Sequence, residues 1–315
     1  MHIADSPQKI LTPTSIALGN FDGIHRGHQK VLEKVFGQID SQRAEYTYPT
    51  VVSFSPHPRE FFTGKKLKLL TPVAEKAQQL DSLGIKQLVL LSFDRELASL
   101  TPPQFVEKVL VQQLQAHHIS VGEDFRFGFQ RKGTATDLKA IASDLGIDVW
   151  INSLHKYRSQ AHHYQNVRIS SSLIRQALES GDIKQANSML GRAYSLIGKV
   201  VKGQQLGRTI GFPTANLQVP SEKFLPRYGV YSVNVSLGDF NSQLPIKGVM
   251  NIGYRPTVQG DAPTIEVHLL NWSGDLYDRI INVSLERFLR PEQKFPSLEA
   301  LKKQIAADCE AALLC

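Results

Sequence analysis

Between Ser15 and Asn152 the chain alternates short apolar runs with segments in which apolar residues recur at helical spacing. The segments between the runs predict helices. Strands that alternate with helices of about ten or more residues form right-handed βαβ units around a parallel sheet, which binds its ligands at the carboxyl ends of the strands. The short runs predict buried strands at Ser15–Gly19, Thr50–Ser55, Gln87–Phe93, His118–Gly122 and Ile147–Asn152.

Local signals mark the ends of two of these helices. Pro72 occupies a predicted first helical position, and Gly84 lies where the same helix should end. Thr101 is followed three residues later by Gln104, which is the spacing of a capping box, and an apolar periodic run then extends to Leu114.

The pattern changes near Leu190, after which apolar and polar residues alternate as they do in half-buried antiparallel strands. Ser273-Gly274-Asp275 predicts a hairpin turn, and a last helix is predicted to begin near Ser297. The alternating segments are Ser195–Val201, Tyr231–Val235, Ile265–Leu270 and Ile281–Leu285.

These patterns predict a two-domain protein of class α/β plus β. Residues 1–187 would form a Rossmann-like parallel α/β domain, and residues 188–315 would form an antiparallel β-barrel with a terminal helix. The linker is predicted to be short and largely helical, around Ser180–Arg192.

Composition narrows the class of protein. The 315 residues are 42% hydrophobic and 21% charged, which suits a globular chain with a sizeable core and excludes a disordered, collagenous or coiled-coil protein. The longest apolar stretch, around Leu88–Leu91, is far shorter than the roughly 20 residues of a membrane span. The first residues lack the pattern of a secretory signal, and Cys309 and Cys315 cannot staple the fold. These features predict a cytoplasmic protein.

A glycine-rich segment, Gly19–His28, directly follows the first predicted strand. Its glycines let the backbone approach a ligand closely, and His25 and His28 share one face near the N-terminus of a helix. Free N–H groups and the helix dipole favour a phosphate there, and two imidazoles can donate hydrogen bonds as charge builds in a displacement. The alternatives are incidental surface histidines and a two-histidine metal pair.

This segment resembles the H-x-G-H signature of the nucleotidyltransferase superfamily, and Ile169–Arg175 resembles its second signature, I-S-S-x-x-I-R. Hydroxyl groups at a helix N-cap followed by an arginine one turn later form a phosphate clamp. The resemblance implies transfer of a nucleotidyl group from a triphosphate, with release of pyrophosphate. The residues that it implies for stabilising the transition state are His25, His28, Arg168 and Arg175. Those that it implies for binding ATP are Gly19, Asn20, Phe21, Asp22, Gly23, Ser171 and Ser172.

Two aromatic loops, Phe54–Phe62 and Gly122–Gly128, follow the second and fourth predicted strands. Aromatic residues clustered with prolines and an arginine in loops suit a planar ring system. Both loops resemble those of the bacterial bifunctional riboflavin kinase/FMN adenylyltransferase (FAD synthetase) family, which often has an acidic residue or asparagine where this chain has Thr134. The flavin-binding residues that the resemblance implies at the adenylyltransferase site are Phe54, Pro56, His57, Pro58, Phe62, Asp124 and Phe127.

The segment Leu206–Asn216 contains the most informative pattern of the second half. The glycine and basic residues that precede Pro213 are typical of a flexible flap over phosphates. Thr214 and Asn216, two residues apart in an extended segment, face one side and offer the oxygen ligands that Mg²⁺ prefers beside a bound triphosphate. The alternative is an irregular loop rich in glycine and proline. The predicted ATP ligands here are Lys202, Gly203, Gly207, Arg208, Gly211 and Pro213.

The same half resembles riboflavin kinases. Pro213–Asn216 matches their P-T-A-N string, and Gly248–Gly253 with Arg255-Pro256-Thr257 resembles G-V-x-N-I-G-x-R-P-T. Arg287–Arg290 with Phe295 resembles the loop that closes over the flavin, which implies a flavin contact for Arg290.

Ile265–Leu270 resembles the strand that bears the catalytic glutamate of riboflavin kinases, here Glu266. The resemblance also implies a flavin contact for Glu266. A glutamate in a strand is more often a solvated surface residue, but the apolar neighbours of Glu266 favour a positioned general base.

Together these resemblances imply a bifunctional enzyme of flavin cofactor biosynthesis. The C-terminal domain would use ATP and Mg²⁺ to phosphorylate riboflavin to FMN, and the N-terminal domain would adenylylate FMN to FAD and release pyrophosphate. The expected partners are riboflavin, FMN, FAD and ATP.

Two other functions stay open. A nucleotidyltransferase for another small phosphorylated acceptor would share the signatures of the first half but leaves residues 190–315 unexplained. A basic nucleic-acid-binding module is compatible with 36 Lys and Arg against 29 Asp and Glu, a net charge of +7. That excess is divided between the two halves and forms no basic arm, so neither nucleic acid nor a membrane is expected as a partner. An oligomer is compatible with the sequence.

Overall fold

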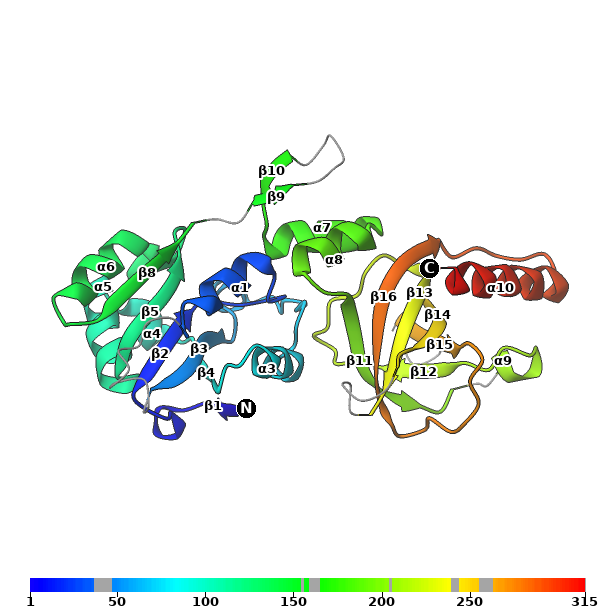
Figure 1. The fold of residues 1–315 in the computed structure, drawn as a ribbon, viewed down its shortest axis with the longest axis horizontal. Coiled ribbons are helices and arrows are strands. Elements are labelled where there is room, and N and C mark those ends of the chain that lie inside the picture. Colours follow the sequence, from blue (N-terminus) through cyan, green and yellow to red (C-terminus); the bar gives the residue numbers. More distant parts are fainter. Residues whose placement is uncertain are drawn as a thin grey trace. The chain divides into compact units, whose positions relative to one another are not determined.

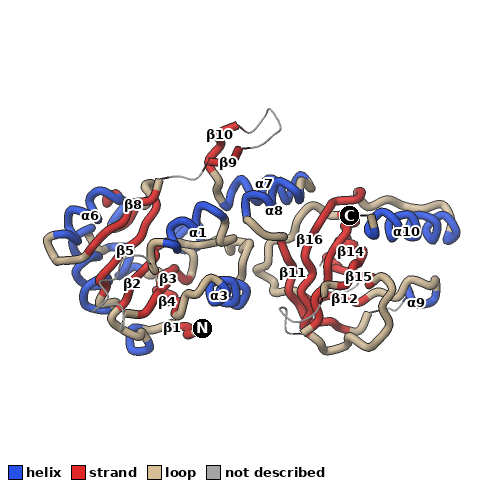
Figure 2. Tube along the Cα trace, in the orientation of Figure 1, coloured by secondary structure: helices blue, strands red, loops and turns tan. Residues whose placement is uncertain are grey.

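The computed structural model of the protein describes residues 1–36, 47–153, 156–158, 165–203, 206–238, 244–254 and 263–314. Its contacts divide the chain into two compact units, Met1–Ser171 and Ser172–Cys315. Strands and helices alternate in the first unit, whereas strands dominate the second (Figures 1 and 2). The assignment of residues 1–187 and 188–315 to two functional domains stays a prediction.

The long strands of the first unit and the short β1 form a parallel sheet, which confirms the predicted α/β architecture. The three-residue edge strand β1 was not predicted, because so short a run shows no period. The order across the sheet is β1 (His2–Ala4), β4 (Gln87–Ser92), β3 (Tyr48–Ser55), β2 (Thr14–Leu18), β5 (Ala116–Gly122) and β8 (Asp148–Asn152).

The loop after β2 lies where the strand order reverses. β2 pairs with β3 on one side and with β5 on the other. The sheet then continues through β4 in one direction and through β8 in the other. In such sheets the ligand crevice opens at the carboxyl ends of the two strands at this reversal. The segment that begins at Gly19 is therefore the expected ligand site.

The remaining elements of this unit connect the strands. The Thr101 capping box is confirmed, since the Gln104 side chain accepts from the Thr101 N–H at 3.0 Å. Pro72 is the N-cap of a helix that begins one residue later than predicted, and Gly84 follows its end. The helices are α1 (Arg26–Glu33), α2 (Pro58–Thr63), α3 (Val73–Ser82), α4 (Arg95–Ser99), α5 (Pro102–Phe105), the π-helical segment η3 (Val106–Gln113) and α6 (Ala135–Ser143), with 3₁₀ turns η1 (Pro7–Lys9) and η4 (Phe129–Arg131). The short strands are β6 (Arg126–Phe127), β7 (Gly133–Thr134), β9 (Lys156–Arg158) and β10 (Gln165–Arg168).

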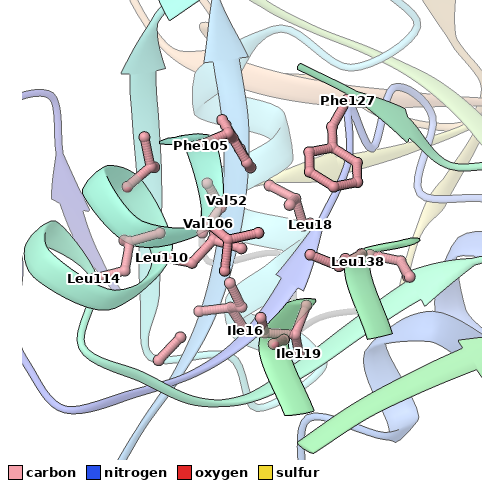
Figure 3. Packing of buried hydrophobic residues seen from close by; sticks show 14 of the residues in the cluster. Ile16, Leu18, Val52, Phe105, Val106, Leu110, Leu114, Ile119, Phe127 and Leu138 are labelled. Atoms are coloured by element: carbon pink, nitrogen blue, oxygen red, sulfur yellow. The ribbon is translucent and has the colours of Figure 1, made fainter. Parts of the chain in front are cut away.

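Neighbouring residues of β2 face two different hydrophobic cores. Ile16 and Leu18 pack in a core with residues of α5, η3 and α6, whereas Ala17 packs in a core with residues of α1 and α3. Every residue of β2 is buried, as expected of a central parallel strand covered on both faces. Figure 3 shows the first core, with Phe105, Val106, Leu110, Leu114, Phe127 and Leu138 around Ile16, Leu18, Val52 and Ile119.

The second unit contains a closed antiparallel barrel, which confirms the predicted β architecture. Each strand pairs with two neighbours, so the ring has no open edge. Its strands in spatial order are β11 (Tyr194–Val201), β12 (Ala215–Gln218), β15 (Pro263–Leu269), β14 (Ile246–Tyr254), β13 (Gly229–Leu237) and β16 (Ile280–Arg290). The helices of this part are α7 (Ser171–Ser180), α8 (Ile183–Leu190), α9 (Leu206–Thr209) and α10 (Leu298–Leu313).

The predicted hairpin turn at Ser273-Gly274-Asp275 is wrong. β15 pairs with β12 and β14, whereas β16 pairs with β11 and β13. The segment between β15 and β16 therefore connects strands that are not neighbours. Turn residues mark a change of chain direction, but they do not specify which strands pair.

The predicted last helix is confirmed. Ser297 caps α10, and its hydroxyl accepts from the Ala300 N–H at 3.1 Å. Ala312 and Cys309 of α10 pack with Val230 and Val249 of the barrel. Burial raises the pKa of the Cys309 thiol, so this side chain is a protonated packing residue. Within the described ranges, no helix has both the length and the apolar character needed to cross a membrane.

Replacement of Leu110 by alanine tests the core in Figure 3. Leu110 is fully buried. We expect Leu110→Ala to lower the free energy of unfolding of the first unit by about 2–5 kcal/mol, because it removes buried apolar contacts and leaves a cavity. Urea unfolding followed by Trp150 fluorescence in a Trp272→Phe background measures this unit alone, since the other tryptophan lies in the second unit.

Leu145→Ala is the matched control, because Leu145 is 50% exposed. It should change the free energy of unfolding by less than about 0.5 kcal/mol. Equal effects of the two substitutions would contradict the packing of η3 against the sheet.

Candidate functional site

The predicted histidine pair lies at the N-terminus of α1. His25 is the N-cap residue, and its Nδ1 accepts a hydrogen bond from the His28 N–H at 3.2 Å. The two rings stack with centroids 3.6 Å apart and planes 14° from parallel. An Nδ1 that accepts leaves the proton of a neutral His25 ring on Nε2, which is then the donor nitrogen of the ring. The structure thus brings the two histidines together where a helix terminus attracts anions.

The loop that leads into α1 has an unusual backbone. Phe21 and Ile24 have φ values of 48° and 41°, and Gly23 has a φ of 89°. Phe21 and Ile24 are each 1% exposed. Left-handed conformations of bulky residues cost about 1–3 kcal/mol each and persist only where the surroundings hold them. Packing therefore holds this loop in a conformation that it would not adopt alone.

Hydrogen bonds hold the middle of the same loop. The Asp22 carboxylate accepts from the Thr71 N–H at 3.1 Å, and the Thr71 hydroxyl accepts from the Gly23 N–H at 2.8 Å. The Ser171 hydroxyl donates to the Asp22 carbonyl at 2.8 Å. Asp22 is 4% exposed, and the two bonds that involve Thr71 are buried. The second serine of the I-S-S-x-x-I-R signature is thus hydrogen-bonded to the segment Gly19–His28.

A lysine from α3 lies beneath the start of the loop. Lys76 Nζ donates to the Asn20 carbonyl at 2.8 Å and lies 3.3 Å from the Ser53 hydroxyl. Burial lowers the pKa of Lys76 to about 8, and the attraction of Asp22 opposes this effect. A positive charge therefore faces the loop at neutral pH.

A cluster of aromatic side chains lies at the carboxyl ends of β3 and β4. The Phe93 ring makes edge contacts with Phe54, Phe61 and Phe62 at centroid distances of 5.7, 5.4 and 5.8 Å. Phe62 is 69% exposed, which leaves one face of the cluster open to a planar ligand.

The other residues of this predicted flavin loop shape the backbone. His57 is the N-cap of α2, where its Nδ1 accepts from the Arg59 N–H at 3.0 Å and its own N–H donates to Glu60 at 3.1 Å. Pro58 follows at the first helical position, and Pro56 precedes the cap. These residues give the loop a fixed form beside the aromatic cluster.

The second predicted flavin loop is divided between surface and core. Arg168 and Asp124 form an ion pair in which each side chain is about half exposed, at 47% and 46%. Phe127 is 5% exposed and packs in the core of the first unit, so its flavin contact stays a prediction. Thr134 caps α6 together with Asp137. Its hydroxyl therefore has a structural partner where the family often has an acidic residue or asparagine.

Ser172 and Arg175 belong to α7 and to the second unit. The Arg175 guanidinium lies over the Phe224 ring, 5.7 Å from its centroid. The predicted string Arg255-Pro256-Thr257 lies outside the described residues.

In the second unit, glycines approach the predicted magnesium ligands closely. A β-carbon at Gly203 would meet the Asn216 amide nitrogen at 2.2 Å, and one at Gly207 would meet the Thr214 hydroxyl at 3.2 Å. A side chain at Gly203 would therefore displace the Asn216 side chain. The structure brings these two glycines together with Thr214 and Asn216.

The other predicted ATP ligands of this flap lie at its surface. Gly211 has a φ of 91°, which favours glycine. Lys202 Nζ lies 6.0 Å from the centroid of the Tyr277 ring. Arg208 and Pro213 are exposed.

Glu266 lies in a row of polar residues across three strands. It is the direct partner of Asn216 on β12 and of Asn251 on β14. Directly opposite residues on one face of a sheet have β-carbons about 4.5–5.5 Å apart. The Glu266 side chain therefore leaves the sheet between those of Asn216, a predicted magnesium ligand, and Asn251. Asn251 was not predicted as a site residue, although it is the asparagine of the string that resembles G-V-x-N-I-G.

The Arg290 side chain connects β16 to α10. Its guanidinium makes a two-pronged ion pair with Asp308 of α10, with Nη2–Oδ2 and Nε–Oδ1 distances of 2.7 and 3.0 Å. The side chains are 18% and 6% exposed. The Arg290 guanidinium also lies 5.7 Å from the centroid of the Phe295 ring. The contact predicted between Arg290 and flavin stays a prediction.

Comparison with known proteins identifies the relationship. A family model described as FAD synthetase matches residues 7–173, and one described as riboflavin kinase matches residues 190–314. A protein of Pseudomonas fluorescens named bifunctional riboflavin kinase/FMN adenylyltransferase is 40% identical over 297 residues, which cover 94% of this chain and 90% of the relative. The chain belongs to the bifunctional riboflavin kinase/FMN adenylyltransferase family.

Other members of the family extend the match. The protein of the same name from Escherichia coli strain K12 is 41% identical and covers 93% of this chain and 90% of its own length. The one from Bacillus subtilis strain 168 is 36% identical, with 95% and 91% covered. A crystal structure from Streptococcus pneumoniae, named a macrolide-efflux protein, is 30% identical with a TM-score of 0.83 and covers 98% of this chain and 97% of that one. The predicted fold and the two predicted enzyme classes, kinase and nucleotidyltransferase, are confirmed.

Besides Asn251, three polar residues that this member of the riboflavin kinase/FMN adenylyltransferase family places at or near the predicted sites were not predicted from the sequence: Lys76, Thr71 and Asp308. Lys76 has a signal, since it lies three residues after Val73 and four before Leu80, on the apolar face of α3. Thr71 and Asp308 have none, because their partners lie far away in the sequence.

The burial of the Arg290–Asp308 pair predicts that removal of its carboxylate strongly destabilises the second unit. We expect Asp308→Ala to lower the free energy of unfolding of the second unit by about 3–5 kcal/mol, because it leaves a largely buried guanidinium without its carboxylate. Trp272 fluorescence in a Trp150→Phe background reports on this unit.

The exposed pair Lys199–Asp278 is the matched control, with side chains 52% and 82% exposed. Asp278→Ala should leave the unfolding transition nearly unchanged. Unchanged stability in Asp308→Ala would show that α10 does not depend on the ion pair.

Proposed function

We propose that residues 188–315 phosphorylate riboflavin to FMN and that residues 1–187 adenylylate FMN to FAD, with ATP as the group donor in both reactions. The observation that carries the proposal is that two enzyme families divide the chain between them, and each part has side chains suited to one reaction. Residues 1–187 are the proposed adenylyltransferase domain, and residues 188–315 are the proposed kinase domain.

In the kinase reaction the 5′-hydroxyl oxygen of riboflavin attacks the γ-phosphorus of ATP, and ADP leaves. Glu266 accepts the hydroxyl proton as general base. The partners of Glu266 in the sheet, Asn216 and Asn251, support this role because they limit where its side chain can lie. The glycine-rich flap with Lys202 and Arg208 holds the phosphates. Most of the acceleration then comes from positioning and charge neutralisation.

Mg²⁺ fits the residues beside Glu266. Thr214 and Asn216 offer a hydroxyl and an amide oxygen, which suit a hard cation that also takes phosphate oxygens. In the part of the chain that the structure describes, no group of three or more His, Cys, Asp or Glu residues could hold a metal ion. Thr214 and Asn216 would therefore hold Mg²⁺ together with the nucleotide. When bound, the ion neutralises phosphate charge.

In the adenylyltransferase reaction a phosphate oxygen of FMN attacks the α-phosphorus of ATP, and pyrophosphate leaves. The stacked His25 and His28 at the N-terminus of α1 donate hydrogen bonds to the α-phosphate as its charge grows. Arg168 stabilises the same charge: Asp124 orients its guanidinium, which has five N–H donors in all. The family resemblance adds Arg175. No covalent enzyme intermediate is required.

The flavin of this reaction would stack on the aromatic cluster around Phe93. The exposed Phe62 and the rigid turn of Pro56, His57 and Pro58 support this placement. An isoalloxazine ring is planar and apolar over most of its surface, and aromatic clusters bind such rings by stacking. Phe54 would form the base of the platform.

One incubation tests the proposal as a whole. Protein with riboflavin, ATP and Mg²⁺ should yield FMN and then FAD, separated by chromatography. Formation of neither flavin would refute both activities. Adenylylation of a different phosphorylated acceptor without any flavin product would favour the alternative nucleotidyltransferase. Absence of nucleic acid as a partner, and location in the cytoplasm, stay predictions from the sequence.

Single substitutions should separate the two reactions. Glu266→Gln keeps the shape of the side chain but removes the proton acceptor, so FMN formation should fall on the order of 10²–10⁴-fold. Conversion of supplied FMN to FAD should persist, because it uses the other unit. His28→Ala should do the reverse and slow FAD formation on the order of 10²–10³-fold while FMN still forms.

Glu286→Gln and His117→Ala are matched controls, since both residues are exposed and lie on strands. They should leave both reactions unchanged. Wild-type melting of each variant must be established first. If Glu266→Gln or His28→Ala depressed both reactions equally in a folded protein, the division of labour between the units would be wrong.

The proposed magnesium ligands predict that the affinity for Mg²⁺ depends on bound nucleotide. With only neutral protein oxygens from Thr214 and Asn216, Mg²⁺ alone should bind weakly, and binding should tighten in the presence of an ATP analogue. Calorimetric titration with and without the analogue measures this difference. Tight binding to the protein alone would imply a carboxylate site elsewhere.

A further inference from the structure

Lys76 is a buried cation that the proposed chemistry does not yet use. Its side chain lies on α3 and is 6% exposed. Its ammonium group donates to the Asn20 carbonyl at 2.8 Å and lies 3.3 Å from the Ser53 hydroxyl, which itself donates to the same carbonyl at 3.1 Å. One backbone carbonyl thus receives hydrogen bonds from two different elements, α3 and β3.

This arrangement fixes the direction of one peptide group. In a trans peptide the carbonyl and the following N–H point in opposite directions. Because Lys76 and Ser53 hold the Asn20 carbonyl inward, the Phe21 N–H must point the other way. Phe21 is the residue with a φ of 48°, so the same hydrogen bonds help to keep its backbone left-handed. The ammonium group therefore acts on the shape of the loop that begins the proposed nucleotide site.

The charge of Lys76 also matters. Asp22 of the loop is the acidic group that attracts it, and Glu75, its neighbour on α3, is 4% exposed. The Asp22 carboxylate also accepts from the Thr71 N–H, so its charge is shared with that backbone group. A cation beneath the loop has the same sign as the positive end of the α1 dipole. Both favour a phosphate above the loop.

We propose that Lys76 is a positioning residue of the adenylyltransferase site, which holds the loop Gly19–Gly23 in the shape that receives the ATP phosphates and adds a positive charge beneath it. This inference rests on the proposed adenylylation of FMN. Lys76 acts through the Asn20 carbonyl and does not touch the reacting atoms.

The protonation of Lys76 provides a readout that a purely structural role would not move. Its pKa of about 8 lies below the ordinary value of 10.5, so the ammonium group loses its proton as the pH rises through about 8. The kcat/KM for ATP reports groups of the free enzyme. It should therefore decline above about pH 8 in FAD formation, and the kinase reaction of the same chain should lack this decline.

The test compares Lys76→Met with Lys86→Met, an exposed lysine that lies just after α3. Both variants are assayed for FAD formation from supplied FMN and for FMN formation from riboflavin, between about pH 6.5 and 9.5. A charge-assisted hydrogen bond contributes enough to binding that its loss should lower kcat/KM for ATP on the order of 10- to 100-fold in Lys76→Met. The remaining activity should no longer decline above pH 8. Lys86→Met should behave as wild type in both reactions.

Each outcome decides the matter. Wild-type kcat/KM in a folded Lys76→Met, or equal losses in both reactions, would overturn the inference. So would a lowered melting temperature with the decline above pH 8 retained, since that result indicates a structural role alone. If Lys76→Met fails to fold, the wild-type profile still decides, because a kcat/KM that is flat through pH 8 contradicts the inference. A wild-type enzyme that makes no FAD from FMN refutes the proposed function instead.

Discussion

The buried turn after β2 is the constraint on which the geometry of the first unit depends. Phe21 and Ile24 hold a left-handed backbone while almost fully buried, a combination that persists only where the surrounding structure holds it. Thr71 and Lys76 secure the same turn with hydrogen bonds from the α3 side. Because α1 begins directly after the turn, the conformation of the turn also sets the direction of the helix N-terminus and the stacking of the His25 ring on the His28 ring.

The two units approach phosphate chemistry with different groups. The first surrounds its loop with a helix N-terminus, a histidine pair and a buried lysine, all fixed by the fold. The second aligns Asn216, Glu266 and Asn251 across neighbouring strands, beside glycines whose backbone lies close to Asn216 and Thr214. In the proposed reactions this difference is physical: fixed protein dipoles stabilise charge at the α-phosphorus, whereas the kinase relies on a cation that arrives with the nucleotide.

Local regularity explains which expectations the structure confirmed. The buried strands of the sheet were predictable because each is a continuous apolar run, and the caps at Thr101 and Ser297 were predictable because capping is a contact between near neighbours. The turn at Ser273-Gly274-Asp275 was not, since the pairing of β15 and β16 depends on barrel closure. The position of Lys76 on the apolar face of α3 is a local signal, but its hydrogen bond to the Asn20 carbonyl is not, because it joins residues 56 positions apart.

Local patterns in the amino-acid sequence are enough to predict the class of each unit, the order of its main elements and most residues of both candidate sites. Hydrophobic periodicity and the spacing of residues within a motif are local properties, which do not depend on residues far away in the sequence. Only the tertiary structure decided what each of those residues touches. It turned Arg290 toward Asp308, buried Phe127 in the core and placed Asn251 opposite Glu266. Such contacts arise from strand register and burial, which depend on all elements of a unit packing at once.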